Sequence, residues 1–394
     1  MRSRNARRPF SGKSVLSRIG LACASATSVG ALACGSTDDV ATPADAGIVD
    51  APGDTPLLPP AFDAGARDAS VDAVVADAAA PPMTYANPVL AHDFPDPFVL
   101  REGSTYFAFA TNGDGKNVQA ATSTDLSTWS DLPDALPTLP AWAGKNRGLT
   151  WAPSVLKRGA WYVMYYTARD VGSELQCIGA AIASAPGGPY VDTSPAPFIC
   201  QVSGSQSFCG SIDPSPFVDT DGTAYLAWKS DENAPACARA PRLWMAALSA
   251  DGRSLAGPGT AILAMDRPWE QPIIEGPSMW LHDGVYFLFY SANAYESAAY
   301  AVGYATCLSP IGPCKKVTLD GPLVKSAGTA LGPVGQEVFT DVRGRTWLAY
   351  HAWTAPSTTY SSGGARSLRI DPLTFVNGAP VFGGPTSTPQ VAPP

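Results

Sequence analysis

Residues 96–110 of this chain read DPFVLREGSTYFAFA, and the same design returns at residues 213–228, DPSPFVDTDGTAYLAW, and at residues 275–290, EGPSMWLHDGVYFLFY. Each segment begins with an acidic residue beside a proline or glycine. An apolar run, a polar turn and an aromatic-rich second run follow. Residues 152–166 and 335–351 have the same layout without the acid. A pair of strand-like runs joined by a tight turn therefore occurs five times.

The spacing of these segments indicates how they are arranged. They start at residues 96, 152, 213, 275 and 335. A repeat of this length, built from small antiparallel sheets, is typical of a β-propeller. We therefore predict an all-β fold, a five-bladed β-propeller with four strands in each blade. A β-sandwich or jelly roll would leave the regular spacing unexplained. The first strands of all blades meet at the axis of a propeller, so Asp96, Asp213 and Glu275 are expected to face one pocket.

The composition agrees with an all-β fold and excludes some partners. The 38 prolines and 37 glycines favour many tight turns over long helices. The formal net charge is −8, and basic residues do not cluster beyond the first 33 positions. Nucleic-acid binding, which needs a Lys/Arg surface, is therefore not expected. We expect a monomer.

The N-terminal residues resemble an export signal. The first 33 residues contain six basic residues and no acidic one, and an apolar stretch covers residues 19–33. Small residues precede Cys34, as in a bacterial lipoprotein signal, so we predict a signal peptide at residues 1–34 and a lipid anchor on Cys34. Cys23 is a competing site, and plain secretion is the alternative. The predicted location is the outer membrane or cell surface, otherwise the exterior.

The next segment, residues 35–84, is rich in Ala, Asp and Pro and almost free of aromatic residues. Such a composition cannot bury enough apolar surface to offset the entropy of ordering. We predict a disordered tether there, followed by the propeller domain at residues 85–394.

Six cysteines follow the signal, and an even number in an exported chain indicates disulfides. Cys307 and Cys314 flank a turn-rich loop and are the safest pair. The simplest completion joins Cys177 to Cys200 and Cys209 to Cys237. The chain has only three histidines and no CxxC pattern, which gives a zinc site little support.

Several short motifs resemble those of glycoside hydrolase family 43, in order and at matching spacing over residues 85–383. The motifs are Asn87-Pro88-Val89 with DFPDPF at 93–98, Trp151-Ala152-Pro153, Ser211-Ile212-Asp213-Pro214, Glu275-Gly276-Pro277, and Arg366 in RSLRIDPL. Ser154 stands where Asp is commoner in that family. Each motif alone is weak, but five in register are specific.

This resemblance implies a five-bladed propeller and an inverting glycosidase with two working carboxyl groups. By position, Asp96 is the general base and Glu275 the general acid. Asp213 would orient Glu275, and its negative charge would help to keep that acid protonated. The expected substrate-binding residues are Trp151, as a sugar platform, and Arg366, which would bind sugar hydroxyls.

Neighbouring residues offer alternatives for these roles. Asp93 and Glu270 lie three to five positions from a candidate and are the competing carboxylates. Family members often carry a fifth-blade histidine near a channel calcium, but Gly335 stands in its place here. We therefore predict no cofactor and no metal ligand. Gln336 would take the polar, substrate-binding role, and His351 is expected to be a core residue.

The expected function is hydrolysis of arabinose- or xylose-containing plant polysaccharide by an exported enzyme. An α-L-arabinofuranosidase or endo-1,5-α-L-arabinanase is favoured. A β-xylosidase is the alternative within the same family, and a non-catalytic sugar-binding propeller is the alternative outside enzymes. A retaining fructosidase fits less well, because the third and fourth blades lack its Arg-Asp-Pro and Glu-Cys motifs.

Overall fold

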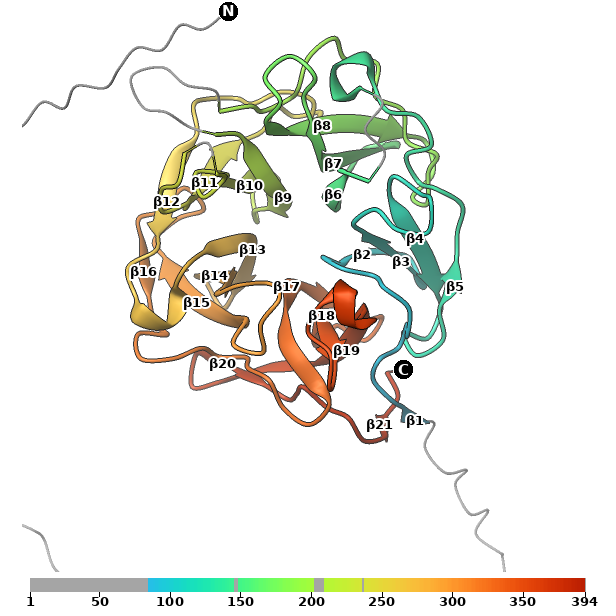
Figure 1. The fold of residues 1–394 in the computed structure, drawn as a ribbon, viewed down its shortest axis with the longest axis vertical. Coiled ribbons are helices and arrows are strands. Elements are labelled where there is room, and N and C mark those ends of the chain that lie inside the picture. Colours follow the sequence, from blue (N-terminus) through green and yellow to red (C-terminus); the bar gives the residue numbers. More distant parts are fainter. Residues whose placement is uncertain (1–83, 145–147, 202–208, 236, 394) are drawn as a thin grey trace, which may run out of the picture. The chain divides into compact units, whose positions relative to one another are not determined.

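The computed structural model describes residues 84–144, 148–201, 209–235 and 237–393. These form a compact unit in which five small antiparallel sheets stand in a ring (Figure 1). The predicted five-bladed β-propeller is confirmed. The predicted signal peptide, Cys34 and nearly all of the tether lie outside the described residues.

The blades follow one another along the chain. The first contains β2 (Phe98–Glu102), β3 (Thr105–Ala110), β4 (Gln119–Ser123) and β5 (Ser130–Asp131), and the second β6 (Trp151–Arg158), β7 (Trp161–Arg169) and β8 (Gln176–Ala183). The third contains β9 (Ser211–Val218), β10 (Ala224–Ser230), β11 (Arg242–Ala247) and β12 (Thr260–Ala264). The fourth contains β13 (Ile274–His282), β14 (Val285–Ala292), β15 (Ala301–Cys307) and β16 (Cys314–Lys316). The fifth contains β17 (Ala330–Thr340), β18 (Thr346–Thr354), β19 (Arg366–Val376) and β20 (Ala379–Phe382).

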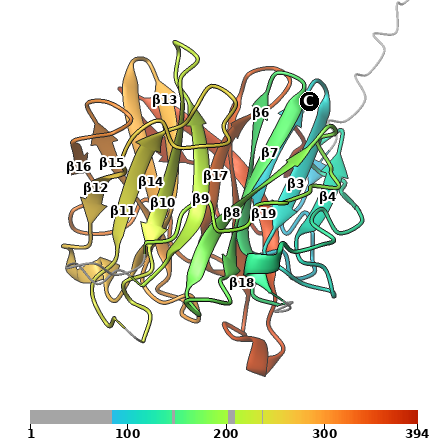
Figure 2. The ribbon, with the colours of Figure 1, turned by 90° about the horizontal axis from the view of Figure 1, so that it is seen from above.

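Short elements complete the described fold: the 3-10 turns η1 (Ala141–Ala143), η2 (Pro268–Glu270) and η3 (Tyr360–Ser362), and the strands β1 (Thr84–Tyr85) and β21 (Gln390–Val391). In the described part of the chain, no helix is long and apolar enough to cross a membrane. In every blade the first strand lies nearest the axis of the ring (Figure 1). The remaining strands of the blade follow outward in chain order, as neighbours in one sheet (Figure 2).

The second blade departs from the predicted four strands, because its sheet has three. Residues 184–200 take the outer position but make only isolated bridges, Ile182 with Val191 and Ile178 with Ile199. This segment contains four prolines, which have no N–H to donate to a ladder. The expectation of a fourth strand here was therefore wrong.

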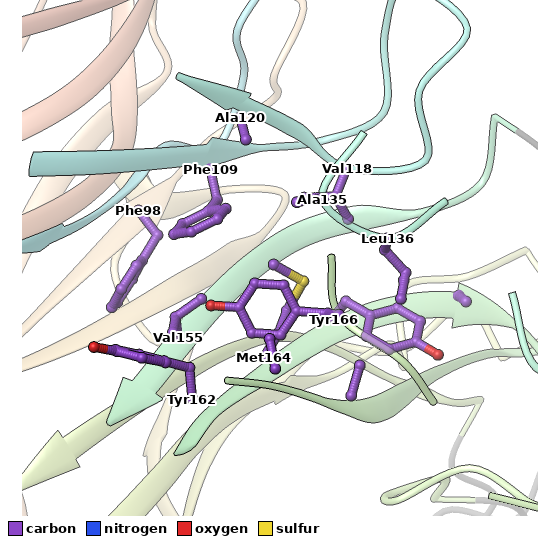
Figure 3. Packing of buried hydrophobic residues seen from close by; sticks show 14 of the residues in the cluster. Phe98, Phe109, Val118, Ala120, Ala135, Leu136, Val155, Tyr162, Met164 and Tyr166 are labelled. Carbon is purple, nitrogen blue, oxygen red and sulfur yellow. The ribbon is translucent and has the colours of Figure 1, made fainter. Parts of the chain in front are cut away.

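Five of the six apolar clusters in the described core lie between two neighbouring blades, and the small sixth cluster belongs to the fifth blade. Figure 3 shows the first, where Phe98 and Phe109 of the first blade pack on Val155 and Met164 of the second. The next residue along β6, Leu156, belongs to the cluster shared with the third blade. Side chains that alternate along a strand thus reach opposite neighbours, which explains the uninterrupted apolar runs in the sequence.

The ring closes through the N-terminal segment. β1 pairs with β21. The side-chain amide of Asn87 both donates a hydrogen bond to the backbone of β19 and accepts one from it. Its Nδ2 donates to the Ile370 carbonyl at 2.8 Å, and its Oδ1 accepts from the Ile370 N–H at 3.0 Å. Leu90 and Phe94 then pack between the fifth and first blades. The ends of the described chain therefore hold the first and last blades together.

The three predicted disulfides are confirmed. Cys307 is bonded to Cys314, Cys177 to Cys200, and Cys209 to Cys237. The first links two strands within the fourth blade. Cys177–Cys200 links β8 to the segment that leads into the third blade. Cys209–Cys237 links the residues just before β9 to the loop between β10 and β11.

Candidate active site

A residue with positive φ stands at an equivalent place in or just before the innermost strand of every blade. These residues are Asp96 (54°), Ala152 (44°), Asp213 (55°), Gly276 (55°) and Gly335 (62°). Asp96 and Asp213 therefore occupy equivalent places in their blades. The expectation that Glu275 matches them was wrong by one residue, because Gly276 is the equivalent position. Glu275 precedes the turn and reaches the axis from the start of β13.

A side chain from the preceding blade, counted around the ring, accepts the backbone N–H at each of these five turns. The pairs are Asp96 with His351 (2.9 Å), Ala152 with Thr111 (2.9 Å), Asp213 with Thr167 (3.2 Å), Gly276 with Asp213 (3.0 Å) and Gly335 with Ser291 (3.1 Å). We call this set the axial ring of hydrogen bonds. It fixes the height and rotation of each turn relative to its neighbour.

The turns surround one cavity of about 970 Å³ at the axis. Its lining includes all six predicted site residues: Asp96, Trp151, Asp213, Glu275, Gln336 and Arg366. The volume is at the upper end of the range typical of small-molecule sites. Residues up to 270 positions apart in the sequence are thus brought to one place.

Asp96 is held by hydrogen bonds on both its backbone and its carboxylate. Its N–H donates to His351 Nδ1, and Thr111 Oγ1 donates to Asp96 Oδ2 at 2.6 Å. Burial, with the nearby Arg366 charge, lowers the pKa of His351, so its ring is neutral and Nδ1 can accept. His351 is buried as predicted, but it also positions Asp96, which the sequence did not indicate.

Glu275 and Asp213 form the second acidic group. Glu275 Oε2 lies 2.9 Å from Lys229 Nζ, and Glu275 Oε1 accepts a bond from the Tyr300 hydroxyl at 2.5 Å. Burial and, second, the Glu275 charge raise the pKa of Asp213 to about 8, against the opposing effect of Lys229. At neutral pH, therefore, this pair of carboxyls retains a proton.

Arg366 lies beside Asp96 in the cavity lining, with 3.6 Å between Nη1 and Asp96 Oδ1. Its guanidinium lies between aromatic rings of Tyr295, Trp353 and Tyr360, at 5.6, 5.9 and 5.6 Å from their centroids. The Asp96 charge raises the pKa of Arg366 against the opposing effect of burial, so the group stays charged. Contacts of this kind hold a guanidinium plane in one orientation.

The two competing carboxylates have other partners. Asp93 Oδ1 accepts the Arg366 N–H at 2.7 Å, so this side chain anchors the start of β19. Glu270 has no exposed surface and does not line the cavity. It accepts bonds from Lys316 at 2.7 Å and Tyr290 at 2.8 Å, together with the N–H groups of residues 266 and 267.

Gln336 and Gly335 lie between the fourth and fifth blades. The Gln336 amide accepts from Ser291 Oγ at 2.8 Å and donates to the Gly276 carbonyl at 2.6 Å. A Cβ on Gly335 would lie 2.5 Å from His351 Nδ1, so no side chain fits at this turn beside His351. Among the described residues, no three His, Cys, Asp or Glu side chains are placed to share a metal ion.

Sequence reasoning missed Lys229, Tyr300 and Thr111, which contact the predicted acids. A signal for two of them was present. Thr111 and Lys229 each follow the aromatic-rich second run of their blade, at the place that Ser291 and His351 occupy in later blades. Tyr300 lies outside the repeated runs, in the loop before β15, and no pattern indicated it.

Comparisons with known proteins agree with this geometry. The family model "Glycosyl hydrolases family 43" matches residues 85–380. The extracellular endo-alpha-(1->5)-L-arabinanase 1 of Bacillus subtilis is 24% identical over 73% of this chain and 87% of its own length. A protein of Xylanibacter ruminicola named as a beta-xylosidase is also 24% identical, over 76% of this chain, which spans only half of that relative.

Among solved structures, a thermostable family-43 glycoside hydrolase is 29% identical, with a TM-score of 0.70, over 79% of this chain and 99% of that one. The matched region contains every residue of the cavity described above and all five blades except the last two residues of β20. The chain belongs to family 43 of the glycosyl hydrolases.

Proposed function

We propose that this protein is an inverting glycosidase that cleaves α-L-arabinofuranosyl linkages in arabinan or arabinan side chains. The observation that carries the proposal is the convergence of Asp96 with the Asp213–Glu275 pair on one cavity, together with Arg366 and Trp151. A non-catalytic sugar-binding module would not need two separately partnered acidic groups.

In this proposal Asp96 is the general base. Thr111 and the axial ring hold its carboxylate at the cavity wall, and the Arg366 charge lies beside it. A water molecule gives its proton to Asp96 as its oxygen bonds to the anomeric carbon. Inversion follows because the water attacks the face opposite the leaving group.

Glu275 is the general acid. It donates its proton to the glycosidic oxygen, which leaves with the electron pair of the broken C–O bond. Asp213 lies next to it in the fold and, by sharing charge and proton with Glu275, keeps a proton available at neutral pH. Trp151, at the cavity wall, would stack on a sugar ring, and Gln336, which also lines the cavity, would contribute its remaining hydrogen-bonding capacity.

Arabinan is the favoured substrate because several relatives, from Bacillus subtilis and Aspergillus species, are named as endo-arabinanases. A β-xylosidase is the second candidate, supported by the Xylanibacter ruminicola relative. The decisive test supplies linear arabinan, xylan and the aryl glycosides of both pentoses. The anomer released first is followed by NMR. Retention of configuration, or no turnover of any of these, would overturn the proposal.

Export is part of the proposal. Three disulfides among the described residues support an oxidising compartment, and two relatives are named as extracellular. A lipid on Cys34 would hold the monomeric propeller at the cell surface. Mass spectrometry of the mature N-terminus, compared with a Cys34→Ala variant, tests the anchor.

A further inference from the structure

The third blade breaks a pattern that the other four share. In the other blades, one residue at the end of the second strand or just after it accepts the N–H of the turn in the next blade. These residues are Thr111, Thr167, Ser291 and His351. The equivalent residue of the third blade is Lys229, which has only donor hydrogens. Asp213 accepts the Gly276 N–H in its place.

Burying Lys229 also costs free energy, because its ammonium group loses its hydration. Its side chain is 1% exposed, and a buried ammonium needs a partner to offset its lost hydration. The partners are Glu275, at 2.9 Å from Nζ to Oε2, and Asp231, at 3.5 Å from Nζ to Oδ1. A threonine or serine would complete the axial ring here without that cost, so stability of the ring does not account for the lysine.

The groups that face Glu275 are mostly acidic. Asp213 reaches it from β9, Asp231 from the end of β10, and Tyr300 from the loop before β15, while Asp96 lies across the cavity. The His351 ring is neutral and lies behind Tyr300, at 6.4 Å between ring centroids. Among the described residues, Lys229 is therefore the cation paired with this group of carboxyls, since Arg366 lies beside Asp96 instead.

We propose that Lys229 is the positioning residue of the general acid: it orients the Glu275 carboxyl through Oε2 and stabilises the carboxylate that Glu275 becomes on giving its proton to the leaving oxygen. This inference rests on the proposed function. Asp213 and Lys229 then act on Glu275 in opposite directions. The carboxyl of Asp213 favours the protonated form before transfer, and Lys229 favours the ionised form after it.

The test uses Lys229→Met, which keeps an unbranched side chain of nearly the same length and removes its charge. We expect kcat on linear arabinan to fall by about 10–100-fold, a part of the ~10²–10⁴ that acid assistance supplies. An arabinoside with a nitrophenyl leaving group needs little protonation, so its kcat should change less than about threefold. The basic limb of the pH profile of kcat/KM should move up by about 1–3 pH units, because the carboxyls lose a neighbouring cation.

Lys229→Thr, which places in the third blade the residue found in the first two, should show the same loss and the same shift while folding at least as stably as the parent. The matched control is Lys316→Met. Lys316 is also buried and paired with two carboxylates, Asp266 and Glu270, but it lies outside the cavity. The Lys316→Met variant should have a lower melting temperature than the parent and an unchanged pH profile of kcat/KM.

Three outcomes overturn the inference: equal losses on both substrates, an unmoved basic limb in both Lys229 variants, or a shift of that limb in Lys316→Met as well. Failure of the proposed function looks different. The parent protein would then turn over none of the glycosides, whatever stands at residue 229.

Discussion

At two of the proposed site positions the backbone adopts a conformation that residues with a side chain usually avoid. Asp96 and Asp213 have φ of 54° and 55°, and such a residue typically costs about 1–3 kcal/mol of stability. The axial ring holds both in place through their N–H groups. The cost is useful, because this turn directs both carboxyls into the cavity rather than along the strand.

Replacing the acid and the base should give different substrate patterns. Glu275→Gln should reduce kcat on linear arabinan by ~10²–10⁴ and spare substrates with good leaving groups, since only the former need a proton donor. Asp96→Asn should reduce both alike, because water must be activated whatever leaves. Steady-state kinetics on the two substrate types checks this. Equal losses in Glu275→Gln would mean that the acid is another residue.

Glu337 should make stability depend on pH. Burial raises the pKa of Glu337 from 4.5 to about 8, so the folded state binds a proton that the unfolded state releases between these values. Its stabilising contribution is therefore full below about pH 4.5 and is lost as pH rises towards 8. Glu337→Gln should flatten the fall of unfolding free energy over this range, as measured by urea titration. An unchanged pH slope would contradict the prediction.

The residues of the site differ in how visible they are in the sequence. Asp96 and Asp213 stand at equivalent places of repeated segments, so the repeat alone brings them together. Glu275 was found as well, although its match is offset by one residue: it stands before the bulge of β13, where Ile212 stands in β9. Lys229 stands at a repeated place, but its contact with Glu275 depends on which side chains meet across two blades. Tyr300 could not be foreseen, since it lies in a loop outside the repeated runs.

At the scale of elements, the N-terminal segment before the first blade has little regular secondary structure, yet its contacts with the fifth blade help to close the ring. Removing the side-chain amide in Asn87→Ala takes the acceptor from the buried Ile370 N–H and leaves the Ile370 carbonyl with the Tyr85 hydroxyl as its remaining side-chain donor. A cost of about 1–3 kcal/mol per unsatisfied group is expected. Chemical denaturation should therefore show a clear loss of stability. Thr374→Ala, an exposed change on the same strand, should stay within about 0.5 kcal/mol.

The blades themselves follow from the sequence to a large extent. Their number and order could be predicted because each apolar run is buried on both faces and thus stands out from its turns. The missing strand of the second blade could not, although prolines 186, 189, 195 and 197 gave the reason. A chain rich in proline can still follow a blade edge through isolated bridges, so composition alone does not decide between strand and loop.

For the molecule as a whole, the disulfides should contribute unequally. Cys209–Cys237 closes a separation of 28 residues and Cys307–Cys314 one of 7. In the chain-entropy model this difference is worth about 1 kcal/mol. The double variant Cys209→Ala/Cys237→Ala should therefore melt lower than Cys307→Ala/Cys314→Ala. Scanning calorimetry of both under non-reducing conditions decides, and the reverse order would contradict the entropic account.

The pairing of β1 with β21 has a consequence for how the gene can be rearranged. Because these two strands are neighbours, a short peptide can join residue 391 to residue 84 without crossing the cavity. The chain can then be opened at an exposed hairpin turn, such as the one at Gly344. Such a circular permutant keeps every blade contact while its new ends lie within the fifth blade. The ring of blades has an order around its axis, but it does not require a particular starting point.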